Sequence, residues 1–216
     1  MNYKAVFFDF DYTLGDATEA IYGGFCYAFQ VLGYPKPKLD DVRHTVGYML
    51  SDAFSLLTGN SDPATVEKFR ELFRTHGGEV QADQTVMFPG AVDLLTALHE
   101  GGVRVGVVSS KRSVSLLNTL DKKGIRGLFD YVVGGELVCA PKPDPEGLNA
   151  GMAAVGAAAG DTLYCGDTVI DAETAKRAGV DFAAVLNGTT GAAAFEVWPS
   201  VHVAPDLIEL RGWLGI

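Results

Sequence analysis

Short runs of apolar residues alternate along this chain with longer stretches in which apolar residues recur at helical spacing. The first run, residues 5–8, is typical of a strand that is buried on both faces of a sheet. Similar runs recur at 103–108, 131–133, 162–165, 182–185 and 201–203. Helical stretches lie at 91–99, 113–123, 144–155, 170–178 and 206–213. Strands that alternate with helices predict an α/β fold with a Rossmann-like parallel sheet, covered by helices on both faces.

The stretch between the first two predicted strands, residues 16–82, has only helical spacing and offers no strand. Three helical segments are expected there: 16–32, 40–59 (interrupted near Gly47) and 63–80. Asp16 is a candidate N-cap for the first segment, and Gly33 is a candidate for the residue that ends it. We therefore expect a Rossmann-like core, formed by residues 1–15 and 83–216, with an all-helical cap domain inserted after the first strand.

Polar side chains follow three of the predicted strands. Asp9 and Asp11 come directly after the first strand, and Ser109 follows the strand at 103–108. Asp167 follows the strand at 162–165, with Asp171 four residues later. Because parallel strands bring their carboxyl ends to one edge of the sheet, where ligands bind in such folds, we expect these side chains to share a site. On the first stretch alone, an ordinary acidic turn stays an equal alternative.

Charge at this edge predicts a bound cation. The four aspartates are joined by Lys142, which is held between two prolines, so the group carries a net charge of −3. Two like charges about 4 Å apart repel by roughly 4 kcal/mol at an effective dielectric constant near 20. Carboxylates must therefore protonate unless a cation binds. Oxygen donors without His or Cys favour Mg²⁺ over zinc, and Mg²⁺ beside a lysine and a hydroxyl is suited to hold a phosphoryl group.

The overall composition narrows the possible partners. With 216 residues, 48% of them hydrophobic, the chain can bury a core and a smaller unit. A net charge of −10 would repel a phosphate backbone, so we expect no nucleic acid partner. No apolar run approaches the roughly 18 residues that a membrane span needs, and no signal peptide precedes the first strand. We expect a cytoplasmic protein with no membrane partner.

The cysteines carry no predicted chemistry. Cys26, Cys139 and Cys165 are odd in number and lie far apart, without the spacing of a zinc site or a redox pair. We expect all three to be buried thiols in a reducing compartment.

Taken in order, the motifs resemble those of the haloacid dehalogenase-like (HAD) hydrolases. Four of them carry the resemblance: Asp9-Phe10-Asp11-Tyr12-Thr13 (DxDxT), Ser109 at a strand end, Lys142 in Lys-Pro-Asp-Pro, and Gly166-Asp167-Thr168-Val169-Ile170-Asp171 (GDxxxD). The helical insert resembles the small cap of this family. Phe88-Pro89-Gly90 and the leucine-rich helix after it resemble the phosphoglycolate phosphatase-like branch. Tyr12 departs from that pattern, because most members of the branch have glycine there.

The resemblance implies a Mg²⁺-dependent phosphoric monoester hydrolase that works through an aspartyl-phosphate. Asp9 would attack phosphorus, and Asp11 would protonate the leaving oxygen and then deprotonate the attacking water. Further roles are implied as follows: Ser109, Lys142 and Thr13 bind phosphoryl oxygens; Asp9, Asp167 and the backbone carbonyl of Asp11 hold the metal; Asp171 orients the metal shell or pairs with Lys142.

The implied substrate is a small phosphorylated metabolite, such as a phosphoglycolate-like acid, a sugar phosphate or a nucleotide, over which the cap would close. Three alternatives stay open: a phosphotransferase or phosphosugar mutase with the same residues, a dehalogenase that needs no magnesium, and a non-catalytic phosphate-binding module. Lys111, Arg112, Arg43 and His44 are candidates for substrate contact, but solvated charge is the favoured interpretation. The sequence does not indicate an oligomeric state.

Overall fold

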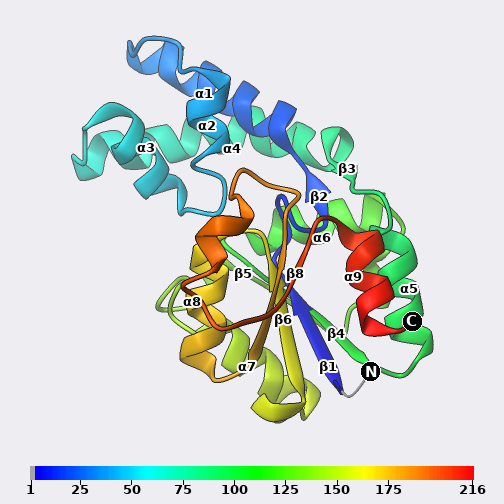
Figure 1. Cartoon of the computed structure of the whole chain (residues 1–216). Helices are drawn as coiled ribbons and strands as arrows, with labels where there is room; N and C mark the ends of the chain where they lie inside the picture. Colours follow the sequence, from blue (N-terminus) through cyan, green and yellow to red (C-terminus); the bar gives the residue numbers. More distant parts are fainter. Residues whose placement is uncertain (1–2) are drawn as a thin grey trace.

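A six-stranded parallel sheet forms the centre of the molecule, in the order β5-β4-β1-β6-β7-β8. It is seen in a computed structural model, which describes residues 3–216 (Figure 1). The strands are β1 (Ala5–Phe8), β4 (Arg104–Ser109), β5 (Tyr131–Gly134), β6 (Thr162–Gly166), β7 (Asp181–Val185) and β8 (Ser200–Ala204). The predicted α/β class with a Rossmann-like sheet is confirmed.

Alternation along β1 divides the core between the two faces of the sheet. Val6 and Phe8 point to one face, where they pack with α5 (Ala91–Glu100), α6 (Ser113–Lys122) and α9 (Leu207–Leu214). Ala5 and Phe7 point to the other, where α7 (Glu146–Val155) and α8 (Val169–Ala178) lie. All four residues of β1 are fully buried, as its continuous apolar run predicts for a central strand.

Four of the helices between β1 and β4 cover the carboxyl edge of the sheet (Figure 1). They are α1 (Thr18–Leu32), α2 (Leu39–Arg43), α3 (Leu50–Thr58) and α4 (Pro63–Gln84). Their apolar faces form a separate core around the rings of Phe25, Phe29, Phe54 and Phe69. The helical insert is confirmed, whereas the boundaries of the cap domain, 16–82, stay a prediction.

The helical stretch expected at 40–59 is interrupted at residues 44–49, which include Gly47 as predicted and form a loop that reaches the core. Two other local expectations are wrong. Asp16 is not the N-cap of α1: Ala17 takes that place, and the Asp16 carboxylate accepts from the backbone N of Thr18. A short antiparallel ribbon of β2 (Gly15–Asp16) and β3 (Val86–Met87) also joins insert and core, where no strand was expected.

The register of the sheet places the site. Phe8 at the end of β1 lies beside Val107 on β4 and Cys165 on β6. The residues that follow these positions therefore reach the same edge, as predicted from the carboxyl ends of parallel strands.

Replacing Phe7 by alanine should lower the free energy of unfolding by about 3–5 kcal/mol, because a fully buried ring is lost and a cavity remains. The ring fits closely: a Cβ atom at Gly106 would lie 2.4 Å from it. Urea denaturation followed by circular dichroism measures the loss. Val31→Ala, at a side chain that is 53% exposed, should change stability by no more than about 0.5 kcal/mol. If both variants lost the same free energy of unfolding, the placement of the Phe7 ring in the core would be wrong.

Candidate active site

The loop after β1 holds the first two predicted site residues in a tight turn. The backbone N of Asp9 still donates to the Cys165 carbonyl of β6 at 2.9 Å, so Asp9 is fixed by the sheet. The backbone N atoms of Leu14 and Gly15 then both donate to the Phe10 carbonyl, which closes the turn. Asp9 is only 1% exposed, so its carboxylate is buried directly after the end of β1.

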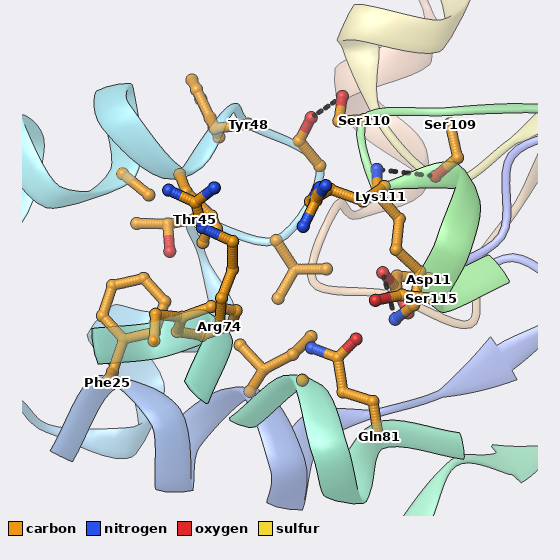
Figure 2. A pocket seen from close by; sticks show the side chains of 18 of the residues that line it. Asp11, Phe25, Thr45, Tyr48, Arg74, Gln81, Ser109, Ser110, Lys111 and Ser115 are labelled. Carbon is orange, nitrogen blue, oxygen red and sulfur yellow. Dashed lines mark hydrogen bonds and ion pairs between the residues drawn. The ribbon is translucent and has the colours of Figure 1, made fainter. Parts of the chain in front are cut away.

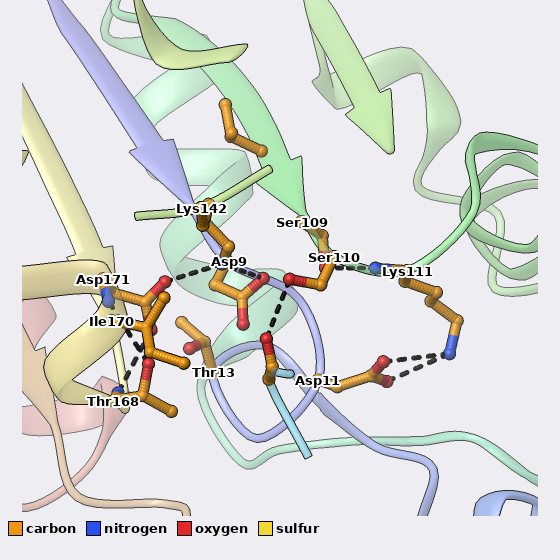
Figure 3. Close-up of polar contacts among 12 residues, drawn as sticks. Asp9, Asp11, Thr13, Ser109, Ser110, Lys111, Lys142, Thr168, Ile170 and Asp171 are labelled. Atoms are coloured by element: carbon orange, nitrogen blue, oxygen red, sulfur yellow. Dashed lines mark hydrogen bonds and ion pairs between the residues drawn. The ribbon is translucent and has the colours of Figure 1, made fainter. Parts of the chain in front are cut away.

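Lys142 lies between two of the predicted carboxylates. Its Nζ atom is 3.0 Å from Asp9 Oδ1 and 2.7 Å from Asp171 Oδ1, and the lysine side chain is 5% exposed (Figure 3). Burial by itself would lower the pKa of Lys142, but the carboxylates of Asp171 and Asp9 outweigh burial and hold that pKa well above its ordinary value. Asp171 and Lys142 thus form an ion pair, while the role of Asp171 in the reaction stays a prediction.

Asp171 is also held from its own helix. Thr168 is the N-cap of α8: its hydroxyl accepts from the backbone N of Asp171 and donates to the Asp171 carboxylate at 2.6 Å. This reciprocal capping box fixes the carboxylate at the helix start, where the positive end of the helix dipole favours a negative charge. The GDxxxD spacing therefore serves both the helix and the ion pair.

Asp167 completes a group of three buried carboxylates. One oxygen from each of Asp9, Asp167 and Asp171 lies within 4.8 Å of the others. Burial, followed by the charges of Asp171 and Asp9, raises the pKa of Asp167 well above its ordinary value. Burial likewise raises the pKa of Asp9 to about 6, although the Lys142 ammonium opposes the shift. This crowding of like charges is costly unless a proton or a cation relieves it.

The group fits a divalent cation. Asp9 Oδ1 has no well-directed hydrogen-bond donor among residues 3–216, although the Lys142 ammonium is close to it. Thr13 Oγ1 donates to Asp167 Oδ1 at 3.1 Å and orients that carboxylate. Gly188 lies directly against it, because a Cβ atom there would be 2.1 Å from Asp167 Oδ2. Buried carboxylate oxygens with fixed orientations are the donors that hard divalent cations prefer.

Asp11 is turned away from this group toward Lys111 (Figure 3). Lys111 Nζ lies 3.0 and 3.2 Å from the two Asp11 carboxylate oxygens, and the two side chains are 4% and 13% exposed. The favoured interpretation of Lys111 as a solvated charge is therefore wrong. Arg112 and His44 are exposed, as that interpretation expects.

Arg43 and Tyr12 connect the helical insert to the loop after β1. The Arg43 guanidinium lies 5.9 Å from the centre of the Tyr12 ring, and the Tyr12 hydroxyl is 2.8 Å from Thr18 Oγ1. Tyr12 has a backbone φ of 62°, a region that glycine adopts without a side-chain clash. The residue that departs from the family pattern therefore keeps the conformation of the loop and adds a contact to the insert.

Ser109 and Thr13 lie where the motifs place them. Ser109 is 6% exposed, and its hydroxyl accepts from the backbone N of Lys111 at 3.3 Å. Thr13 is fully buried, and its backbone carbonyl accepts from the Asn187 side chain. The structure thus brings all seven predicted site residues to one edge of the sheet, in two adjoining groups around Asp9 and Asp11.

Sequence reasoning missed Tyr164. Its fully buried hydroxyl accepts from Lys142 Nζ at 3.2 Å and lies 2.9 Å from the Val108 carbonyl and 3.1 Å from Asp171 Oδ1. A tyrosine within a buried strand needs a partner for its hydroxyl, and that signal could have identified it. Lys142 thus has oxygen neighbours in three side chains.

A cavity of about 290 Å³ adjoins Asp9 and Asp11 between the insert and the core (Figure 2). The loop at 44–49 closes one side of it: Ser110 Oγ donates to the Gly47 carbonyl at 2.8 Å. The side chains of Thr45, Arg74 and Gln81 line it from the insert. The site is therefore a partly enclosed chamber with the carboxylates at its base.

Comparison with known proteins agrees with the fold and the motifs. The family model for haloacid dehalogenase-like hydrolases matches residues 6–185. The crystal structure of a Bacteroides fragilis protein described as a putative haloacid dehalogenase-like hydrolase superposes on this chain with a TM-score of 0.93. The two sequences are 35% identical, and the match covers 96% of this chain and 99% of that one. The family model covers more than half of the chain, and the chain therefore belongs to the haloacid dehalogenase-like hydrolase family, a class of enzymes with this α/β core.

Curated relatives place the chain within the predicted branch. The pyrophosphatase PpaX of Halalkalibacterium halodurans is 29% identical over 215 residues, which cover 98% of both chains. A phosphoglycolate phosphatase of Caulobacter vibrioides is 30% identical over 198 residues, 88% of this chain and 82% of that one.

Two further expectations can be compared with the structure. Cys165 is buried as expected, but Cys26 is only partly buried and Cys139 is exposed, so the prediction of three buried thiols is wrong. Cys139 lies in an irregular loop before Lys142, where no sheet or helix covers it. No helix within residues 3–216 is long and apolar enough to cross a membrane.

Addition of MgCl₂ to metal-free protein should raise the melting temperature, because a cation relieves the repulsion among Asp9, Asp167 and Asp171. At a hundredfold excess over the dissociation constant the gain should be about 2.7 kcal/mol. Asp167→Asn removes one buried like charge, so its metal-free melting temperature should equal or exceed that of the wild type, while the gain from Mg²⁺ should largely disappear. An undiminished Mg²⁺ effect in this variant would contradict the assignment.

The contribution of Asp9 to the stability of metal-free protein, taken as the difference between the wild type and Asp9→Asn, should fall as pH rises from 3.8 to about 6, the interval between the ordinary and the folded pKa of Asp9. Folding raises this pKa, so the folded state binds more protons, and the associated stability is complete below the interval and lost above it. Urea titrations of both proteins at several pH values measure this difference, and a difference that does not change with pH would contradict the shift.

Proposed function

We propose that this protein is a Mg²⁺-dependent phosphatase that hydrolyses a small phosphomonoester through an aspartyl-phosphate on Asp9. The observation that carries the proposal is the buried group of Asp9, Asp167, Asp171 and Lys142, with Asp11 beside it under the helical insert. The named relatives support it, because they include phosphoglycolate phosphatases and a pyrophosphatase. A non-catalytic binding module has less support, because every motif residue is present.

The charge of the site supports a cation and a phosphoryl group together. The four aspartates and two lysines, Lys142 and Lys111, leave a net charge of −2, since Lys111 adds one positive charge to the sequence estimate. A single divalent cation would neutralise it. Asp9, Asp167 and the backbone carbonyl of Asp11 would hold Mg²⁺, and bound Mg²⁺ would offset the negative charge of the phosphoryl oxygens as they approach the carboxylates.

The nucleophile must be ionised to attack phosphorus. The pKa of Asp9, raised by burial to about 6, still leaves its carboxylate mostly charged at neutral pH. Lys142 supports the ionised form and, with Ser109 and Thr13, would bind the phosphoryl oxygens. Attack by an Asp9 oxygen forms the bond to phosphorus, and the bond to the leaving oxygen breaks.

Asp11 would serve as the general acid and then as the general base. It would donate a proton to the leaving oxygen and then accept one from the water that hydrolyses the aspartyl-phosphate. Its carboxylate lies in the wall of the cavity, on the side where a leaving group would sit. Lys111 holds this carboxylate through both oxygens and thus fixes its direction. The insert would exclude bulk water while the aspartyl-phosphate forms.

Wild-type protein should release inorganic phosphate from p-nitrophenyl phosphate only when Mg²⁺ is present, and Asp9→Asn should lower turnover by at least about a thousandfold because the nucleophile is lost. Asp93→Asn, the same exchange at an exposed position on α5, serves as the control and should keep full turnover. Metal-independent turnover, or an active Asp9→Asn variant, would contradict the proposal. Transfer of the phosphoryl group to an added alcohol in preference to water would favour the phosphotransferase alternative.

Asp11→Asn should reduce steady-state turnover by about 10²–10⁴-fold, the usual contribution of a general acid and base. The variant should still form the aspartyl-phosphate from p-nitrophenyl phosphate, because nitrophenolate leaves without a proton. Rapid mixing should therefore show a burst of about one equivalent of nitrophenolate per site, followed by slow turnover. If steady-state turnover stays at the wild-type rate, the proton-transfer role of Asp11 is wrong.

A further inference from the structure

Gln81 is a buried polar residue for which the motifs supply no role. It lies near the end of α4, its residue is only 5% exposed, and its side chain points into the cavity of about 290 Å³ (Figure 2). No hydrogen bond reaches its carboxamide from the described residues, whereas its backbone carbonyl accepts from Thr85. The carboxamide is open to the cavity, because Gln81 is not among the buried side chains that lack a partner. A ligand that fills the cavity would displace water from this amide and would have to supply its hydrogen-bond partner.

The backbone carbonyl of Gln81 takes part in the last turn of α4. The Thr85 backbone N and hydroxyl donate to the Gln81 carbonyl at 2.9 and 2.6 Å, which closes the last turn of α4. Across the cavity lie Ser115 and Asn118 of α6, a helix of the core. Gln81 therefore faces the cavity from the insert, with residues of the core also in the lining, as suits a residue that positions a substrate.

The charged groups that line the same cavity are already paired or, for Arg112, exposed to solvent. Asp11 is bound by Lys111 through both carboxylate oxygens. The Arg74 guanidinium donates to Glu67 and to the Arg70 carbonyl. Arg112 lines the cavity but is exposed to solvent. The inner wall, meaning the buried part of the lining, thus offers a substrate no unpaired cation among the described residues. Its polar groups outside the ion pairs are neutral, and among them the amide of Gln81 can both donate and accept.

The remaining wall on the side of the insert is apolar. It is formed by Ile21, Phe25, Val46, Leu50, Ala53 and Phe73. At roughly 30 Å³ for each water molecule in the liquid, the volume of about 290 Å³ corresponds to about ten waters. A leaving group with a carbon framework can fill this space against the apolar wall, whereas a two-carbon acid or an inorganic phosphate would leave most of it unfilled.

We propose that Gln81 determines substrate specificity, and that the leaving group is an uncharged alcohol of several carbons that bears a further hydroxyl, as in a sugar or polyol phosphate. A carboxamide both donates and accepts, which matches a hydroxyl, whereas a second anion would find no unpaired cation on the inner wall. This inference rests on the phosphatase function proposed above. It places the phosphoryl group at Asp9 and the hydroxylated framework between α4 and α6.

Wild-type protein with Mg²⁺ should show a higher kcat/KM for glucose 6-phosphate, fructose 6-phosphate or glycerol 3-phosphate than for phosphoglycolate or pyrophosphate. Phosphate release measures all five under the same conditions, and p-nitrophenyl phosphate is the reference. If phosphoglycolate or pyrophosphate has the highest kcat/KM, or if none of the hydroxylated esters is hydrolysed, the substrate class is wrong although the phosphatase function stands. Without Asp9-dependent hydrolysis of the reference ester, both proposals fail.

Gln81→Leu replaces the amide by an apolar group of similar size. It should lower the ratio of kcat/KM for the best hydroxylated ester to that for p-nitrophenyl phosphate by about ten- to a hundredfold, because the substrate hydroxyl loses its partner. The loss should lie mainly in KM. Gln84→Leu, the same exchange at an exposed position one turn further along α4, should leave the ratio unchanged. Equal losses for both esters in Gln81→Leu would show a structural role and overturn the proposal.

Discussion

The arrangement of this site depends on one buried ammonium group. Lys142 lies within 3.0 Å of Asp9 and 2.7 Å of Asp171, on the loop before α7, while the two aspartates follow β1 and β6. Removing one partner from a buried ion pair generally costs about 3–5 kcal/mol, because the other charge stays without compensation. Three segments that are distant in sequence are therefore held at the same point by one cation. The three carboxylates around it still exceed its charge, which is why the group suits a divalent metal.

A second ion pair, between Lys111 and Asp11, lies in the wall of the cavity next to the carboxylate group around Lys142. Lys111 and Asp11 lie on the side of the cavity, beyond Ser109, and the insert closes over them through contacts such as Ser110 to Gly47. In the proposed reaction, the two halves of the chemistry are separated in space. Attack on phosphorus would take place around Asp9, whereas proton transfer and recognition of the leaving group would take place at the cavity wall, around Asp11 and Gln81. Substrate specificity could then change through residues of the insert, while the carboxylates around Lys142 stay the same.

Many strands and helices of the core could be predicted from local sequence patterns. A run of four apolar residues predicts β1, and glycines such as Gly156 and Gly179 end helices in the left-handed conformation that they adopt freely. The motif residues could be assigned to one edge because parallel strands leave no other place for them. Lys111, Tyr164 and Gln81 could not be assigned in this way. Lysine is usually solvated, tyrosine usually packs in a core, and a glutamine on a helix gives no sign of what it faces.

The sequence by itself determined the class of fold, the helical insert after the first strand, and the set of carboxylates with Lys142 that forms the base of the site. These follow from periodicity, turn residues and the direction of parallel strands, which are all local properties of the chain. Tertiary structure alone decided that Asp171 pairs with Lys142, that Lys111 is buried on Asp11, and that Gln81 faces a cavity. Each of these depends on the distance between segments far apart in sequence, and such distances are set by packing of the whole molecule.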